Sequence, residues 1–153
     1  MTRGWPFRGS CRRYNTHGAF DMNSRPLDEI ARRHGILLIL EFGSAVSGRL
    51  HAKSDLDVAV LLDRPGLSYG EYGHLIHDLQ TLAPGREVDL AVLNRADPLF
   101  LKQVTERCRL LFGSPRRLHE LKLYAFKRHQ DHRRYLALER AYVTRTLRGP
   151  VTS

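Results

Sequence analysis

The pattern of apolar and polar positions predicts a chain in which strands and helices alternate. Three short runs rich in leucine, isoleucine and valine predict buried strands over residues 36–42, 56–62 and 88–93. The run at 56–62 is apolar on both faces, which is typical of an interior strand covered by helices. A shorter run at 109–112 predicts an edge strand.

Helical spacing fills the intervals between these runs. Pro26 stands at the first position of a short helix that Gly35 ends, and a further helix is expected to open at Ser44 and reach residue 51. After the turn residues 63–66, apolar positions recur every three or four residues over 72–82 until Pro84.

The last third of the chain is expected to be helical apart from the edge strand. Asp97 is a capping residue with Pro98 after it, and the helix that follows has one apolar stripe made of Leu101, Val104 and Cys108. Ser114 repeats the cap signal before a long helix toward residue 147, which is either interrupted or merely solvated across the polar stretch 127–134.

Composition favours one cytoplasmic domain. The chain has 153 residues, 42% of them apolar, which suffices for a modest core. No apolar stretch is long enough to span a membrane, and the N-terminus lacks the apolar centre of a signal peptide. The two cysteines, Cys11 and Cys108, are expected to be free thiols in a reducing cytoplasm rather than a disulfide or zinc site.

A net charge of +9 favours an anionic partner. Within the first 24 residues, four arginines and one aspartate give +3, which leaves +6 on the remainder. Residues 1–25 are interpreted as a flexible basic extension. No basic run carries interleaved aromatic residues, so modest nonspecific nucleic-acid affinity is favoured over a dedicated nucleic-acid interface.

The strongest chemical signal is a Gly-Ser pair that is separated by ten residues from an Asp-x-Asp motif. Gly43 and Ser44 end the first apolar run and offer backbone N–H groups and a hydroxyl at a helix start, which suits a triphosphate. Asp55 and Asp57 lie two residues apart, so both project from one face of a strand.

Asp89, in the third run, is the candidate third carboxylate. Carboxylates from neighbouring strands suit Mg²⁺, and two such ions would stabilise the attacking and leaving oxygens of a displacement at phosphorus. Asp-x-Asp alone is also common at solvated strand starts. Its combination with the Gly-Ser turn and Asp89 favours a metal-dependent catalytic site.

Other motifs fit less well. Residues 43–50 have the glycine spacing of a P-loop but lack its lysine. No nucleophile elbow surrounds Ser44 or Ser47. The pairs His74/His77 and His129/His132 have helical spacing without a zinc-protease pattern, so solvated helix faces are favoured over a metal site.

Through these residues the chain resembles the minimal nucleotidyltransferase (MNT) domains of the DNA polymerase beta superfamily. The resemblance rests on residues 42–44, Gly48 and 54–58, and the stretch 88–99 followed by 109–112 is similar to prokaryotic MNT antitoxins. It implies an α/β (α+β) fold with a small mixed sheet flanked by helices and a long C-terminal helix. The corresponding division is an extension at 1–25, a nucleotidyltransferase core at 26–113 and a helical segment at 114–153.

The resemblance also implies an activity and a partner. Such antitoxins transfer AMP from ATP to a tyrosine of a HEPN ribonuclease toxin, which silences the toxin. Carried over by position, Gly43, Ser44 and the neighbouring Ser54 would bind the nucleotide. Asp55 and Asp57 would bind two Mg²⁺ ions, and Asp89 would complete the catalytic metal site.

The chain departs from the family pattern inside the turn. Many members carry a basic residue between the Gly-Ser pair and the next glycine, where Ala45, Val46 and Ser47 stand here. Arg49 and Lys53 are the candidates to replace that phosphate contact. Two alternatives to the antitoxin enzyme stay open: a nucleotidyltransferase acting on a small molecule or RNA end, and a non-catalytic antitoxin that binds its toxin or DNA.

Overall fold

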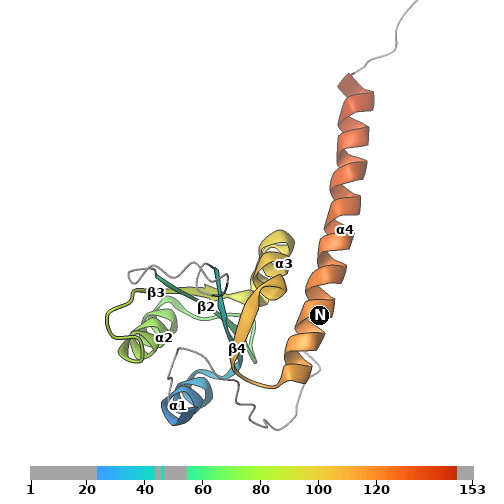
Figure 1. Cartoon of the computed structure of the whole chain (residues 1–153). Helices are drawn as coiled ribbons and strands as arrows, with labels where there is room; N and C mark the ends of the chain where they lie inside the picture. The colour runs from blue at the N-terminus through green and yellow to red at the C-terminus, as the bar shows by residue number, and fades with distance from the viewer. Residues whose placement is uncertain (1–23, 44–45, 47–54, 148–153) are drawn as a thin grey trace, which may run out of the picture.

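The computed structural model describes residues 24–43, 46 and 55–147, which form an α/β fold (Figure 1). The elements, in chain order, are α1 (Ser24–His34), β1 (Ile36–Phe42), β2 (Leu56–Leu62), α2 (Tyr69–Thr81), β3 (Val88–Val92), the 3-10 turn η2 (Leu93–Arg95), α3 (Pro98–Glu106), β4 (Cys108–Phe112) and α4 (Pro115–Leu147). The helix expected to open at Ser44 lies outside the described residues.

The four strands form one mixed sheet in the order β3-β2-β1-β4. β2 runs parallel to β3, whereas β1 runs antiparallel to both β2 and β4. The small mixed sheet, the interior position of the 56–62 strand and the edge position of the 109–112 strand are confirmed. Because β1 and β2 are antiparallel, the end of β1 and the start of β2 lie at the same end of the sheet.

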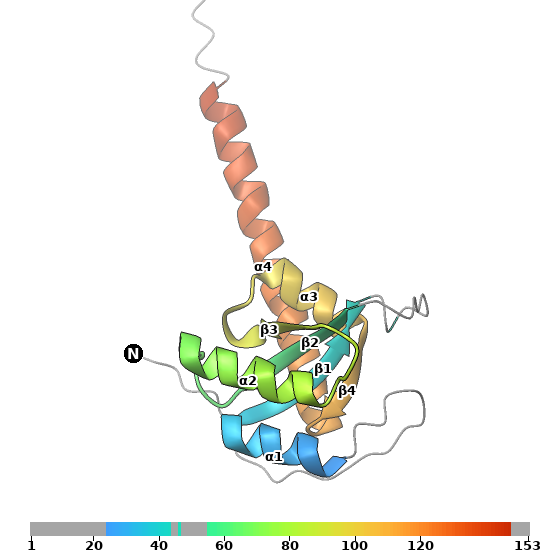
Figure 2. The ribbon, with the colours of Figure 1, turned by 90° about the vertical axis from the view of Figure 1, so that its left-hand side faces the viewer.

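Helices cover both faces of the sheet, as Figures 1 and 2 show. α1 and α2 pack on one face through buried residues that include Leu27, Ile30, Leu75 and Leu79. α3 and the first turns of α4 pack on the other face through Leu101, Val104, Leu121 and Ala125. The prediction that the 56–62 strand is apolar on both faces and covered by helices is therefore confirmed.

Only the start of α4 belongs to this core. The helix continues without a break through the polar stretch 127–134 and extends well beyond the sheet (Figure 2). Leu121 keeps 3% of its surface exposed, whereas Leu138 keeps 72%. Among the described helices, none is both long enough and apolar enough to cross a membrane.

Local capping explains where two helices begin. The Asp97 carboxylate accepts hydrogen bonds from the backbone N–H groups of Leu99 (2.8 Å) and Phe100 (3.3 Å), which confirms the predicted cap of α3. At α2, Ser68 and Glu71 form a reciprocal capping box that starts the helix three residues before its first predicted apolar position, Tyr72.

One predicted residue belongs to a different element. Cys108 is not part of the α3 helix, because α3 ends at Glu106 and Cys108 begins β4 as the register partner of Phe42. Its side chain still packs against the same core cluster as Leu101 and Val104, which is why the apolar stripe continued through it. At Cys108, backbone pairing with the edge of β1 replaces a further turn of helix.

Candidate active site

The end of β1 and the start of β2 meet at Gly43. This glycine has φ +79°, a left-handed conformation that residues with a side chain rarely adopt. A Cβ atom built on it would lie 2.1 Å from Asp57 Oδ2, so the bare backbone of Gly43 is in direct contact with the Asp57 carboxylate. The glycine of the Gly-Ser pair and the second aspartate of the Asp-x-Asp motif therefore form one site.

Asp89 joins this site through the register of the parallel strands. Asp57 on β2 is the direct Cα partner of Asp89 on β3. Both side chains project from the face that α3 and α4 cover, since their strand neighbours Ala59 and Ala91 belong to that core cluster. Asp55, directly before β2, is exposed and precedes Asp57 by two residues.

The carboxylates influence one another electrostatically. The pKa of Asp57 is raised, first by partial burial and then by the negative charges of Asp89, Asp55 and Glu41. Glu41 itself is buried in β1 and forms an ion pair with Arg109 of β4. Burial and the neighbouring carboxylates thus disfavour the negative charge of Asp57, and a cation beside it would stabilise that charge.

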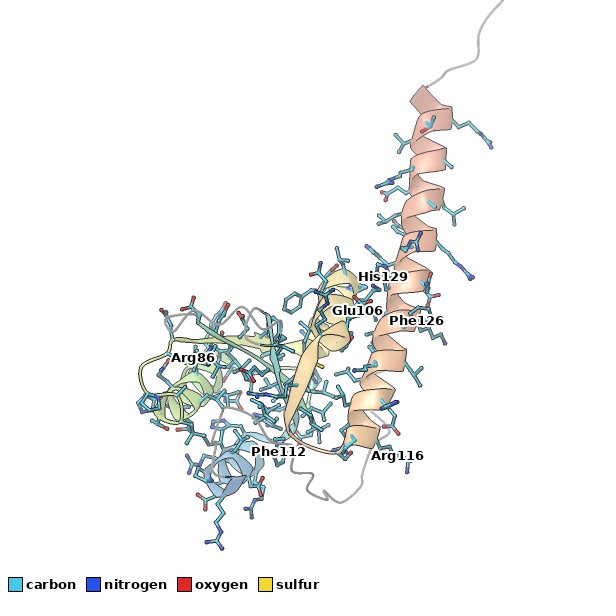
Figure 3. The ribbon with its side chains drawn as sticks, viewed as in Figure 1. Arg86, Glu106, Phe112, Arg116, Phe126 and His129 are labelled. Atoms are coloured by element: carbon cyan, nitrogen blue, oxygen red, sulfur yellow. The ribbon has the colours of Figure 1, made fainter. Side chains whose placement is uncertain are left out.

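Arg86 is a site residue that the sequence analysis missed. Its guanidinium Nη2 donates a hydrogen bond to the backbone carbonyl of Asp55 at 3.2 Å, and its positive charge opposes the rise in the pKa of Asp57. Figure 3 shows Arg86 beside the start of β3, on the side of the molecule away from α4. Its place in the Arg86-Glu87-Val88-Asp89 sequence, next to the third carboxylate, was the available signal.

The carboxylates fit a divalent cation that is shared with a substrate. Within residues 24–43, 46 and 55–147, no three His, Cys, Asp or Glu side chains form a ready-made metal cluster. Magnesium is usually held by one or two carboxylates together with substrate phosphates and water, so an enclosed protein cage is not required. Asp57 and Asp89 are register partners on neighbouring strands and offer a matching pair of oxygen donors.

Four predicted nucleotide-binding residues, Ser44, Arg49, Lys53 and Ser54, lie outside the described residues. Among the described histidines, His74 and His77 are exposed, as predicted for a solvated helix face. His129 and His132 are instead half-buried. His129 faces the end of α3 near Glu106 (Figure 3), so it lies at the contact between α3 and α4.

Comparison with known proteins gives one family and a set of similar solved structures that includes a group of toxin-antitoxin complexes. Residues 26–117, more than half of the chain, match the family model "Polymerase beta, Nucleotidyltransferase". None of the curated proteins matches the chain.

Two solved structures illustrate the group. A toxin-antitoxin crystal structure with AMP-PNP contains a chain 25% identical to this one, with a TM-score of 0.63, over 84% of this chain and 100% of the other. A complex of a tri-AMPylated Shewanella oneidensis HEPN toxin with its MNT antitoxin contains a chain 22% identical, with a TM-score of 0.59, over 86% of this chain and 100% of the other. The second likeness is one of fold alone.

Proposed function

Because the chain belongs to the polymerase beta nucleotidyltransferase family, we propose that it is an antitoxin that transfers AMP from ATP to a tyrosine hydroxyl of a HEPN ribonuclease toxin. The observation that carries the proposal is the register of Asp57 and Asp89 beside the Gly43 backbone. The chain is similar to the whole length of a chain from a toxin-antitoxin structure with AMP-PNP. This similarity supports ATP as the substrate and a toxin as the partner.

Each residue has a distinct task in the proposed reaction. The Gly43 backbone and Ser44 bind the β- and γ-phosphates. Asp55, Asp57 and Asp89 would hold Mg²⁺, which would neutralise the phosphate charge and the charge that develops on the leaving pyrophosphate. Asp89 would also accept the proton of the incoming hydroxyl, a role that its exposure on the edge strand supports.

The transfer balances as a simple displacement. The tyrosine oxygen forms a bond to the α-phosphorus, the bond from that phosphorus to the bridging oxygen breaks, and pyrophosphate leaves. The proton of the tyrosine hydroxyl passes to a carboxylate. Catalysis depends mainly on positioning and charge stabilisation, as in other phosphoryl-type transfers. We assign this chemistry to a core at residues 26–113, with the helical segment 114–153 available for the partner.

Radiolabelled ATP tests the proposal directly. The chain, co-purified with a candidate HEPN toxin, is incubated with Mg²⁺ and ATP labelled at either the α- or the γ-phosphate. Label from the α-position should appear on a toxin tyrosine, and label from the γ-position should not. Transfer of the γ-label, or no transfer at all, would refute AMP transfer.

A matched pair of variants links the labelling to the site. Asp57→Asn removes the charge beside Gly43 and should abolish labelling without unfolding the chain. Asp63→Asn changes an exposed aspartate at the opposite end of β2 and should leave labelling intact. Toxin protection that survives in the Asp57→Asn variant would instead favour neutralisation by binding alone.

A further inference from the structure

A pocket of about 320 Å³ adjoins Gly43. It lies between the end of β1 and the last two turns of α3, and its lining consists of Phe42, Gly43, Phe100, Gln103, Val104 and Arg107. Phe42 and Phe100 meet edge to face with their ring centroids 5.9 Å apart, which gives the pocket one rigid apolar wall. Gly43 is shared between this pocket and the Asp57 carboxylate.

Arg107 brings a positive charge to this pocket. It is the exposed residue that follows α3, and none of the ion pairs between described residues involves it. Its neighbour Glu106 is already bonded to Lys102 at 2.6 Å. The charge of Arg107 also helps to lower the pKa of Glu106, but its guanidinium forms no ion pair with a described residue. It is therefore available to an anion, and its planar fork of N–H donors matches phosphate oxygens.

The Gly-Ser turn itself supplies no positive charge. No lysine or arginine occurs from Gly43 to Gly48. A triphosphate bound to this turn carries several negative charges, and a positive side chain beside the turn would offset those of the β- and γ-phosphates. Apolar walls such as Phe42 and Phe100 strengthen a charge pair beside them, because they exclude water.

We propose that Arg107 binds the terminal phosphates of the nucleotide from the α3 side of the Gly43 turn. The inference rests on the proposed function, since it takes the nucleotide to be a triphosphate held by that turn. In this arrangement the nucleotide tail is held between α3 and the turn, with Asp57 and Asp89 at the reacting phosphorus. Arg107 is a binding residue, which contacts the leaving group rather than the acceptor.

Comparing ATP with AMP isolates the contribution of the terminal phosphates. Affinities of the full chain for ATP and for AMP, both with Mg²⁺, are measured by titration calorimetry for the wild type and for Arg107→Gln. We expect ATP to bind about 10-fold to 100-fold more weakly to the variant, the loss expected for a charged hydrogen bond. AMP affinity should stay unchanged, because AMP lacks the β- and γ-phosphates.

Two further variants control for charge and fold. Arg107→Lys keeps the charge but not the fork of donors, so its ATP affinity should fall between those of the wild type and Arg107→Gln. Arg95→Gln removes an exposed arginine that follows the end of β3, whereas Asp89 lies at the start of that strand. This variant should leave both affinities unchanged. Circular dichroism of each variant verifies that the fold is intact.

The outcomes separate this inference from the proposed function. Equal losses for ATP and AMP would place Arg107 at the base or ribose and overturn the inference. Unchanged ATP affinity in Arg107→Gln would also overturn it, while leaving the proposed function standing. Absence of ATP binding by the wild-type chain would overturn both.

Discussion

A side chain at position 43 has no room and no favourable backbone conformation. We expect Gly43→Ala to lower AMP transfer by at least about 100-fold, because a displacement of about 1 Å in a reacting group has effects of that size. The added Cβ would meet Asp57 Oδ2 at 2.1 Å, so the carboxylate must move. Transfer is measured by toxin labelling under saturating ATP.

Gly85→Ala is the matched control for the backbone conformation. Gly85 has φ +82°, nearly the value of +79° at Gly43, but a Cβ there would have no neighbour within 4 Å. Both substitutions should cost about 1–2 kcal/mol of stability, since a left-handed conformation disfavours any residue with a side chain. Activity losses of equal size in the two variants would show that strain alone, and not the contact with Asp57, is responsible.

Asp78 should make the stability of the fold depend on pH. Its side chain accepts a hydrogen bond from the buried His34 ring at 2.8 Å and pairs with Arg33 at 3.0 Å. These contacts, the His34 hydrogen bond first, lower the pKa of Asp78. The ionised form is thus favoured in the folded state. Its stabilisation is complete above the unfolded-state pKa and is lost as the pH falls through the lower, folded-state pKa.

Urea unfolding at several pH values measures this contribution. At neutral pH, Asp78→Asn should be less stable than the wild type by about 1 kcal/mol, a modest value because the side chain is partly exposed. The difference should shrink as the solution becomes acidic enough to protonate Asp78. An Asp131→Asn variant, altered at an exposed position on α4, should show no such trend. A difference for Asp78→Asn that stays constant with pH would exclude this linkage.

At the scale of single elements, α4 should respond very differently to the same substitution along its length. Leu121→Ala removes a side chain that is 3% exposed, whereas Leu138→Ala removes one that is 72% exposed. The first should cost about 2–5 kcal/mol and the second less than about 0.5 kcal/mol. Thermal or urea unfolding of the two variants measures both values. Similar losses would mean that the far half of α4 is packed in solution.

The elements themselves were largely predictable from sequence. Every described strand was predicted within one residue of its observed ends, because apolar runs bounded by glycine or polar residues leave few alternatives. Glu41 was not anticipated as a buried charge inside β1. Its partner Arg109 is far away along the chain, and only the pairing of β1 with β4 brings the two together.

The site was predictable in its composition but not in its contacts. A two-residue spacing is enough to place Asp55 and Asp57 on one side of a strand. The pairing of Asp57 with Asp89, in contrast, depends on the register of β2 against β3, which spacing along one strand does not determine. Arg86 was missed for a similar reason, because its contact with Asp55 joins the starts of two neighbouring strands.

At the scale of the whole molecule, positive charge is concentrated on α4. Residues 115–147 contain nine lysines and arginines and three aspartates and glutamates, a net +6 (9 minus 3) of the +9 of the chain. Arg128 lies over the ring of Tyr124 at 5.7 Å, and Tyr135 and Tyr142 are 62% and 71% exposed. Folding into a helix thus interleaves arginine with aromatic side chains, which the linear sequence did not reveal.

This distribution predicts nonspecific binding to single-stranded nucleic acid that weakens steeply with salt. Replacing Arg133, Arg134 and Arg140 by glutamine should reduce the slope of log affinity against log salt by about 2, at about 0.7 per neutralised phosphate contact. Fluorescence anisotropy with a mixed-sequence DNA oligonucleotide measures the slope. The triple variant Arg25→Gln, Arg32→Gln and Arg95→Gln removes three exposed charges that lie outside α4 and should change the slope less. ATP affinity should be equal in both variants, because neither alters the Gly43 turn. If the variant outside α4 had the larger effect, nucleic acid would lie along the sheet domain, and α4 would be left for a protein partner.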